Sequence, residues 1–348
     1  MNRNSRVLAL LVAVLVLGAV AVGTTLHAAG RAAEKDRARK DGPSVRSGAV
    51  ALDTPGLSVF RNMAWGPHRD EIAAVPTARP TGPRTASGVR CLRFHTAAGT
   101  GICLQAVHGT LRESYRAVVL DARLRELRRY DLAGVPSRAR VSPDGRSVAW
   151  TVFVSGDSYA GAAFSTRTSV LDLRTGRLDR SLEDYRLFLD GRPHTAVDIN
   201  IWGVTFVDDT RFYATAATGG RTYLVRGDRA ERTLRALHTN VECPSLSPDG
   251  TRIAYKKRVE GPSSDAPWRL YVLDLRTLRE SATAERRSID DQAAWQDGQT
   301  LVYSLPGNYG ADLWTVPADG SGAPAVSMAA ALAPAFTGRP QSGASSAP

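Results

Sequence analysis

The chain has 348 residues, of which 43% are hydrophobic and 23% charged, an ordinary globular composition able to bury a large core. Its formal net charge of +11 comes almost entirely from arginine, because only four of the 45 basic residues are lysine. With no basic stripe interleaved with aromatic residues, this charge favours a solvated basic surface and gives no support to a nucleic-acid partner.

The N-terminus carries a hydrophobic segment typical of exported or anchored proteins. Arg3 and Arg6 precede an uninterrupted apolar run from Val7 to Gly23. As a helix this run spans roughly 25 Å, which is short for a bilayer and long for a signal-peptide core. Two alternatives stay open over residues 7–26. We favour a single-pass transmembrane anchor that leaves residues 1–6 in the cytoplasm and the remaining chain outside it; the other is a signal peptide whose cleavage releases a secreted protein.

Three segments lack the large apolar side chains that folding requires. Residues 27–56 combine Ala, Gly, Pro and Ser with charges of both signs, and residues 329–348 are mostly Ala, Gly, Pro and Ser. Neither segment is expected to bury enough surface to offset the loss of chain entropy. The first is expected to be a disordered tether and the second a disordered tail. Residues Pro76 to Gly88 hold three prolines and two glycines and are expected to form a long loop.

A repeated hairpin runs through the chain between these segments. The string VSPDGRSVAW from Val141 returns as LSPDGTRIAY from Leu246 and degenerates to WQDGQTLVYS from Trp295. Proline presets φ at the first turn position, aspartate folds its carboxylate back on the backbone, and glycine takes the left-handed conformation. The residues predicted to form these turns are Pro143, Asp144, Gly145, Pro248, Asp249 and Gly250.

A second β-rich element follows each hairpin, and weaker copies fill the intervals. TSVLDLRTGRL begins at Thr168 and RLYVLDLRTLRE at Arg269, and both alternate with the period of a strand. Weaker hairpins begin near Met63, Cys91 and Phe206, which makes six hairpin starts. Units of about four strands predict an all-β propeller over residues 57–328, most simply with six blades, although five or seven stay open. The first unit shows only two strands, so a strand near the C-terminus is expected to complete it.

The repeat resembles that of TolB-like propellers. Ser-Pro-Asp-Gly followed by Arg/Ser-Val/Ile-Ala-aromatic occurs twice in strong form, and the likeness covers roughly Leu57 to Met328. The family implies a six-bladed propeller preceded by an α/β domain and a role with a peptidoglycan-associated lipoprotein. Only about thirty residues separate the apolar segment from the first blade, so we expect no α/β domain and carry over the propeller alone.

Local motifs for catalysis or metal binding are not evident. The string from Gly156 to Gly161 places Ser158 between glycines, but the second glycine comes one residue too late for a nucleophile elbow. The six histidines show no ligand spacing, and the pairs Asp208–Asp209 and Asp290–Asp291 belong to no calcium-loop signature. We expect no catalytic residue, no metal and no cofactor.

Cys91 and Cys103 flank a short turn near Ala97 symmetrically, which predicts cross-strand neighbours. Outside the cytoplasm such a pair can oxidise to a disulfide, and the alternative is two small buried thiols. Cys243 has no evident partner.

The register of the first strand in each unit predicts where a ligand would bind. Five residues before each turn, and next to that position, the chain carries polar or amphipathic residues, whereas positions nearer the turn are mostly apolar. Either they are solvated strand starts, or they converge on one mouth of the channel with Trp202 as a platform. The predicted ligand-binding residues are Arg61, Asn62, Arg138, Asn200, Trp202, Glu242, Asp290 and Asp291.

These features favour a monomeric, non-catalytic, extracytoplasmic propeller that binds a protein, peptide or cell-envelope ligand at this mouth. Two alternatives stay open: a propeller enzyme of the glycosidase or lyase kind with carboxylates from several blades, and a sensor domain of a cell-envelope system. Two or three carboxylates within about 10 Å at the mouth would favour the enzyme. A mouth of Arg, Asn and aromatic side chains would favour binding.

Overall fold

The computed structural model describes residues 3–109, 113–156, 164–261 and 266–338, which form two units. One unit consists of residues 1–42 with 65–67, and its main element is helix α1 (Arg3–Lys40). Residues Leu11–Arg31 of α1 have a mean hydropathy of 2.1 and are long and apolar enough to cross a membrane. The helix continues to Lys40, where a disordered tether was expected, because residues 28–40 are rich in Ala, Arg and Lys, which favour helix.

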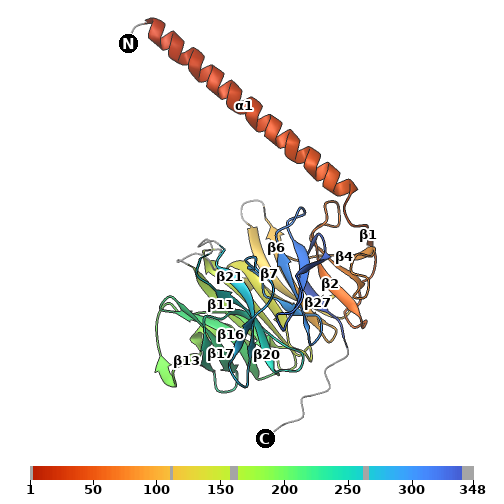
Figure 1. The fold of residues 1–348 in the computed structure, drawn as a ribbon, viewed down its shortest axis with the longest axis vertical. Helices are drawn as coiled ribbons and strands as arrows, with labels where there is room; N and C mark the ends of the chain where they lie inside the picture. The colour runs from red at the N-terminus through yellow and green to blue at the C-terminus, as the bar shows by residue number, and fades with distance from the viewer. Residues whose placement is uncertain (1–2, 110–112, 157–163, 262–265, 339–348) are drawn as a thin grey trace. The chain divides into compact units, whose positions relative to one another are not determined.

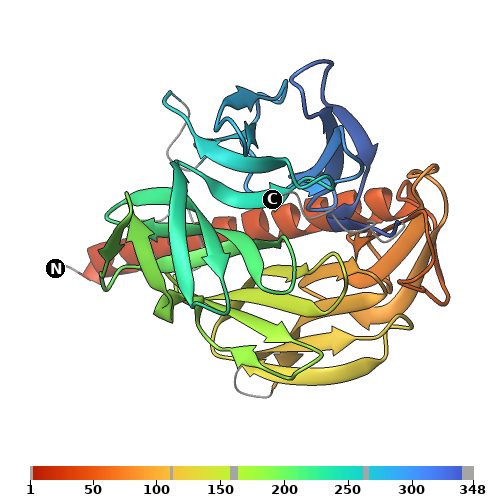
Figure 2. The same ribbon diagram turned by 90° about the horizontal axis from the view of Figure 1, so that it is seen from below.

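The second unit is a six-bladed β-propeller with one sheet per blade (Figure 1, Figure 2). Blade 1 has the order β1 (Val45–Ser47), β4 (Arg84–Arg90), β3 (Glu71–Pro76), β2 (Leu57–Asn62), β27 (Ala331–Phe336). Blade 2 contains β5 (Arg93–Ala97), β6 (Thr100–His108), β7 (Glu113–Leu120) and β8 (Glu126–Leu132). Blade 3 contains β9 (Val135–Val141), β10 (Ser147–Ser155), β11 (Ser165–Asp172) and β12 (Leu178–Asp179), followed by the 3-10 helix η1 (Leu182–Asp184).

Blade 4 is the widest of the six sheets. Its order is β14 (Arg192–His194), β13 (Arg186–Leu189), β18 (Thr233–Thr239), β17 (Arg221–Asp228), β16 (Arg211–Thr218), β15 (Asn200–Phe206). Blade 5 contains β19 (Glu242–Leu246), β20 (Arg252–Arg258), β21 (Trp268–Asp274) and β22 (Glu280–Ala282). Blade 6 contains β23 (Ala294–Trp295), β24 (Thr300–Leu305), β25 (Asp312–Pro317) and β26 (Ala325–Met328).

The ring closes through its last strand. One edge strand of each sheet packs on that of the next: β27 on β5, β5 on β9, β9 on β15, β15 on β19 and β19 on β23. Strand β27 is therefore the innermost strand of blade 1, and it pairs antiparallel with β2, with Val59 opposite Ala335. This confirms the expected closure by a strand near the C-terminus. It also corrects the expected disordered tail, because strand β27 buries Ala331, Pro334 and Ala335 in the closed blade.

Blade 1 contains more structure than its composition indicates. Strand β4 occupies residues 84–90, part of the expected loop, and β1 pairs with it in parallel inside the expected tether. Val50 and Leu52 are also buried, in a cluster with Phe94 of blade 2. These residues are ordered by pairing and packing with distant strands, which composition alone does not reveal.

The two Ser-Pro-Asp-Gly turns connect the innermost strand of blades 3 and 5 to the second strand. The amides of Gly145 and Gly250 each donate to the carbonyl of the turn serine at 2.9 Å. Their φ angles are 75° and 73°, the left-handed conformation that glycine adopts most readily. Asp249 Oδ1 accepts from the Ser247 hydroxyl at 2.5 Å and from the Thr251 amide at 3.0 Å. The local turn chemistry thus defines these hairpins.

Gly250→Ala is expected to lower the free energy of unfolding by about 1 kcal/mol, because a Cβ is disfavoured at φ 73°. Gly298, in the equivalent turn of blade 6, is a matched control: both positions have open space for a Cβ, but only Gly250 has a left-handed backbone. Gly298→Ala should be neutral or slightly stabilising. Denaturant unfolding of both variants tests this, and equal midpoints would contradict the turn assignment.

Two carboxyl groups, one buried and one half-buried, lie between blades 3 and 4. Asp179 on β12 accepts from the guanidinium of Arg229, which lies in the β17–β18 turn, at 3.0 Å, and both side chains are at most 5% exposed. Arg177 and Arg232 also reach Asp179, at 3.1 and 3.4 Å. Glu183 differs, because it accepts from neutral donors such as the Thr168 amide, and no cation among the described residues forms an ion pair with it. Burial raises the pKa of the Glu183 carboxyl to about 7 despite these hydrogen bonds.

Cys91 and Cys103 form a disulfide with a Cα–Cα distance of 5.4 Å. The expected cross-strand pairing of these two residues is wrong in register, because Phe94 lies opposite Cys103 and Cys91 precedes β5. The bond therefore fastens the crossover from blade 1 to the second strand of blade 2. Cys243 is a buried free thiol.

Candidate binding site at the channel mouth

Charged side chains from three blades meet where the innermost strands begin. Arg138 comes from β9, Glu242 is the first residue of β19, and Asp290 lies just before β23. The second and third strands of blade 5 add Lys256, Arg258 and Trp268. We call the group formed by Arg138, Glu242, Lys256, Arg258, Trp268 and Asp290 the mouth cluster.

Lys256 is the centre of the mouth cluster. Its Nζ lies 2.5 Å from Asp290 Oδ1, 3.8 Å from Glu242 Oε2 and 3.9 Å from the centroid of the Trp268 ring. The Lys256 side chain is 1% exposed, so its charge depends on these partners. A buried ammonium between two carboxylates and an aromatic face holds residues of blades 5 and 6 in one arrangement.

The two carboxylates of the cluster differ in exposure. Glu242 is fully buried and also accepts from Arg258 Nε at 2.7 Å, so it is enclosed by cations. Asp290 is 49% exposed, and its Oδ1 lies 3.7 Å from Arg138 Nη2. Burial alone would raise the pKa of the Asp290 carboxyl, but Lys256, Arg138 and Arg93 outweigh it and lower that pKa. Asp290 is therefore an ionised group that solvent reaches.

Beside the mouth cluster, Gln292 connects several blades. The side-chain amide of Gln292 donates to the backbone carbonyls of Gly203, Val204 and Pro244, at 3.2, 3.3 and 2.6 Å. The space beside Gln292, among Arg138, Arg140 and neighbouring side chains of β10, has no volume for a water molecule. The side chains around Gln292 are therefore closely packed.

Aromatic side chains form one wall of the mouth. Trp202, Phe153, Trp268 and Cys243 are buried together. Phe164, half-buried, packs edge-on against Trp202 with ring centroids 5.6 Å apart. The guanidinium of Arg258 lies over the Trp268 ring at 5.1 Å. This wall gives the cluster a rigid apolar backing.

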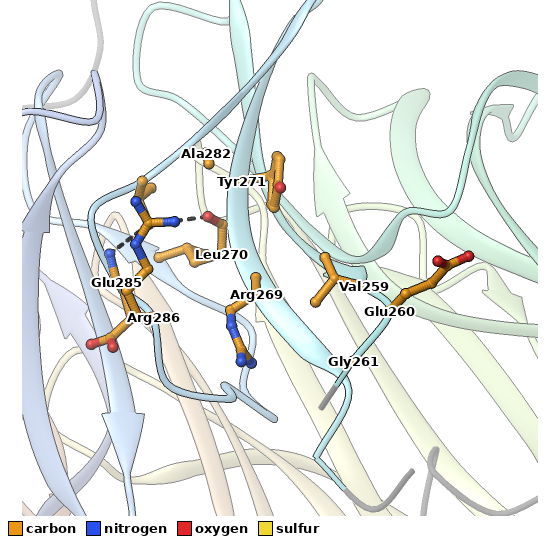
Figure 3. Close-up of a pocket in the computed structure, with 10 residues that line it drawn as sticks. Val259, Glu260, Gly261, Arg269, Leu270, Tyr271, Ala282, Glu285 and Arg286 are labelled. Carbon is orange, nitrogen blue, oxygen red and sulfur yellow. Dashed lines mark hydrogen bonds between the residues drawn. The ribbon is translucent and has the colours of Figure 1, made fainter. Parts of the chain in front are cut away.

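A cavity of about 430 Å³ opens along the strand that carries Trp268 (Figure 3). It is lined by the residues that follow Trp268 on β21 and by the segment between blades 5 and 6. Glu285 in this segment is buried and accepts from Arg287 at 2.5 Å and from the Tyr303 hydroxyl at 2.6 Å. Its lining residues are Val259, Glu260, Gly261, Arg269, Leu270, Tyr271, Ala282, Thr283, Glu285 and Arg286.

Three of the predicted ligand-binding residues, Arg138, Glu242 and Asp290, belong to the mouth cluster. Asp291 follows Asp290 in the chain, but its side chain forms a hydrogen bond inside blade 6. Its Oδ2 accepts from the Ser304 amide at 3.0 Å. Asn200 starts β15 and joins two blades, because its Oδ1 accepts from the Thr166 amide at 2.7 Å.

Arg61 and Asn62 lie at the same face of the ring but one strand away from the channel. Both are on β2, and they pair with the start of β27, which is the true innermost strand. Arg61 binds Asp70 at 2.7 Å, and Asn62 is fully buried against Arg84. Their expected place on an innermost strand is corrected: the hairpin near Met63 joins the second and third strands of its blade.

Trp202 is also corrected as a platform for a ligand. Its side chain is 1% exposed and lies behind Phe164. Trp202→Ala is thus a core truncation that would destabilise the propeller, and it is unsuitable as a binding test.

Sequence reasoning missed Arg93, Lys256, Arg258 and Trp268. One signal was present: Lys256 and Lys257 are the only lysines after residue 40 in a chain that otherwise uses arginine. Among the described residues, no group of three or more His, Cys, Asp or Glu side chains is placed to hold a metal ion. Ser158, the rejected nucleophile, lies outside the described residues.

No family model and no curated protein sequence matches this chain. Among solved structures, the propeller is similar to TolB from Acinetobacter baumannii, with a TM-score of 0.53 and 19% identity over 82% of this chain and 67% of that one. The chain has the TolB propeller fold. Before the TolB-like propeller, the described residues form helix α1 and no α/β domain.

Two further structures resemble the TolB-like propeller more weakly. A puromycin-hydrolyzing peptidase from Mycobacterium tuberculosis has a TM-score of 0.48 and 17% identity over 79% of this chain and 44% of that one. An oligogalacturonate lyase in complex with manganese has a TM-score of 0.45 and 10% identity over 72% of each chain. A shared fold does not determine function, so the function must be argued from the site.

Proposed function

We propose that this chain is a non-catalytic binding propeller outside the cytoplasm, and that a protein, peptide or cell-envelope ligand binds at the mouth cluster. The observation that carries the proposal is the meeting of Arg138, Lys256 and Asp290 from three blades at one mouth. The half-exposed Asp290 and the 40% exposed Arg258 offer both charge signs to a ligand. The close packing around Gln292 and the aromatic wall preorganise this surface, which favours binding without rearrangement.

The enzyme alternative has a weaker basis in this geometry. Glu242 and Asp290 both contact Lys256 Nζ, so two carboxylates do lie within the separation used by glycosidases. Acid–base catalysis on a sugar needs one carboxyl that stays protonated near neutral pH. Glu242 forms ion pairs with Lys256 and Arg258, and the pKa of the Asp290 carboxyl is lowered. The pair therefore serves better as a charged recognition surface.

The N-terminal helix supports a position at the membrane. Its apolar stretch fits either a signal anchor or a signal peptide, and we propose an anchor that keeps the propeller outside the cytoplasm. A sensor role in a cell-envelope system would use the same mouth and differ only in having a signalling partner.

Site-specific photo-cross-linking in intact cells tests the proposed site. A photoreactive amino acid at Arg258 is expected to give a discrete adduct, because Arg258 is at the mouth and partly exposed. Asp290→Asn should greatly reduce this adduct, because it removes the exposed negative charge of the cluster.

Arg276 provides the matched control for this experiment. It lies in the exposed β21–β22 turn of the same blade, at the end of β21 away from the mouth. Equal adducts at both positions, or an adduct at Arg258 that Asp290→Asn leaves unchanged, would contradict binding at the mouth.

A further inference from the structure

Blade 4 is two strands wider than the four-stranded blades. Strand β13 pairs in parallel with β18, and β14 pairs with β13, so both lie beyond the fourth strand of the blade. One face of this sheet carries the core of blades 3 and 4, including Leu187, Leu234 and Val225. On the opposite face, the inner residues Leu224 and Tyr213 pack with blade 5. The outer part of that opposite face is exposed.

A single cross-strand row crosses this exposed part. Tyr213 pairs with Arg226, Arg226 with Arg235, and Arg235 with Phe188. Paired residues share a face of the sheet, and adjacent strands are about 4.8 Å apart. The row therefore places two arginine residues on neighbouring strands between two aromatic residues. The Arg235 guanidinium lies over the Phe188 ring, 4.4 Å from its centroid.

The charge of this row is not neutralised by neighbouring carboxylates. Arg226 and Arg235 are both exposed, and within the described parts of the chain no carboxylate oxygen lies within 4.0 Å of either guanidinium. Arg186, two residues before Phe188, adds a third exposed cation on the same face. Like charges placed directly opposite each other destabilise a sheet. The outer part of blade 4 thus maintains a local concentration of positive charge, and the opposed Arg226 and Arg235 do so at a cost in stability.

We propose that this row, Tyr213, Arg226, Arg235 and Phe188 together with Arg186, is a binding surface for a phosphate-bearing linear polyanion. Adjacent planar guanidinium groups match the paired oxygens of a phosphate group and bind it with charge-assisted hydrogen bonds. The exposed cations occupy three adjacent strands of one sheet, which suits successive phosphates of an extended polymer better than one isolated anion. This surface is on the outer part of blade 4 and is separate from the mouth cluster.

Binding of fluorescent linear polyphosphate to the full-length protein in neutral detergent tests this surface. The double variant Arg226→Gln/Arg235→Gln is expected to weaken binding by roughly tenfold or more, since it removes several charge-assisted hydrogen bonds. Without polyphosphate, this variant should melt no lower than wild type, because the like-charge pair is gone. With saturating polyphosphate, wild type should gain thermal stability and the variant should not.

The double variant Arg192→Gln/Arg221→Gln controls for net charge. It removes two exposed arginines from the same sheet, but both lie on the opposite face. Equal weakening in the two double variants would overturn the proposal. So would equal binding of inorganic phosphate at the same phosphate concentration, or tighter binding to micelles containing short-chain phosphatidylglycerol, which would assign the surface to lipid.

Discussion

Asp179→Ala is expected to lower the free energy of unfolding by about 3–5 kcal/mol, the range for removing one partner of a buried ion pair. Arg229 is 5% exposed and would lose its carboxylate at 3.0 Å. Arg177 and Arg232 would lose theirs as well, but both are about half exposed and solvent can hydrate them. The loss should therefore come mainly from Arg229, which would remain as a buried charge between blades 3 and 4.

Urea unfolding of the full-length protein measures this loss, and Glu126→Ala is its control. Glu126 binds Arg129 on the outer strand of blade 2, where both side chains are at least 36% exposed. Exposed pairs of this kind contribute about 0–1 kcal/mol. If both variants lower the free energy of unfolding by a similar small amount, the Asp179–Arg229 ion pair does not stabilise the contact between blades 3 and 4. The double variant Asp179→Ala/Arg229→Met should recover part of the stability, because it removes the buried charge.

Arg84→Met is expected to destabilise the closed ring by roughly 3 kcal/mol, because it leaves buried acceptors without a donor. Arg84 on β4 is buried and donates to Asn62 Oδ1 and to the carbonyl of Ala330, both within 2.8 Å, and also to the carbonyl of Ala329. These two carbonyls immediately precede β27. Burial lowers the pKa of the guanidinium to about 10. This side chain therefore connects the first blade's N-terminal strands to the strand that closes it.

Thermal unfolding and limited proteolysis together test the Arg84 prediction. In Arg84→Met, cleavage at the C-terminal end should become faster, because β27 loses an attachment. Arg79→Met, which changes an exposed arginine after β3 in the same blade, should alter stability by less than about 0.5 kcal/mol. Unchanged proteolysis with a lowered melting temperature would contradict a specific role in ring closure.

The fold could be predicted from local turn chemistry, because the Ser-Pro-Asp-Gly strings define hairpins wherever they occur. The place of β2 could not be predicted in the same way. The hairpin from Met63 also contains two strands and a turn, but its turn joins the second and third strands of a blade. Which strand is innermost depends on pairing with residues more than 250 positions away, such as Ala335 with Val59.

The candidate site, too, could be predicted from the sequence only in part. Register counting located Arg138, Glu242 and Asp290, because all three lie at or near the start of an innermost strand. Register counting could not predict that Phe164 covers Trp202. The alternation of residues along a strand indicates which face of the sheet a side chain lies on, but not whether other side chains cover it. Lys256 escaped notice because it comes from the second strand of its blade, opposite Glu242 in the ladder.

Closure by β27 also has a consequence for how the protein is made. Synthesis proceeds from the N-terminus, so β2 is available long before residues 331–336 exist. Until then β2 presents an unpaired inner edge, a template for pairing with other chains. The ring can close only after residues 331–336 have been synthesised, so the innermost strand of the first blade is made after every other strand of the propeller. A prematurely terminated product would keep that edge open, and this would distinguish it from the finished protein for any protease or chaperone that recognises unpaired strands.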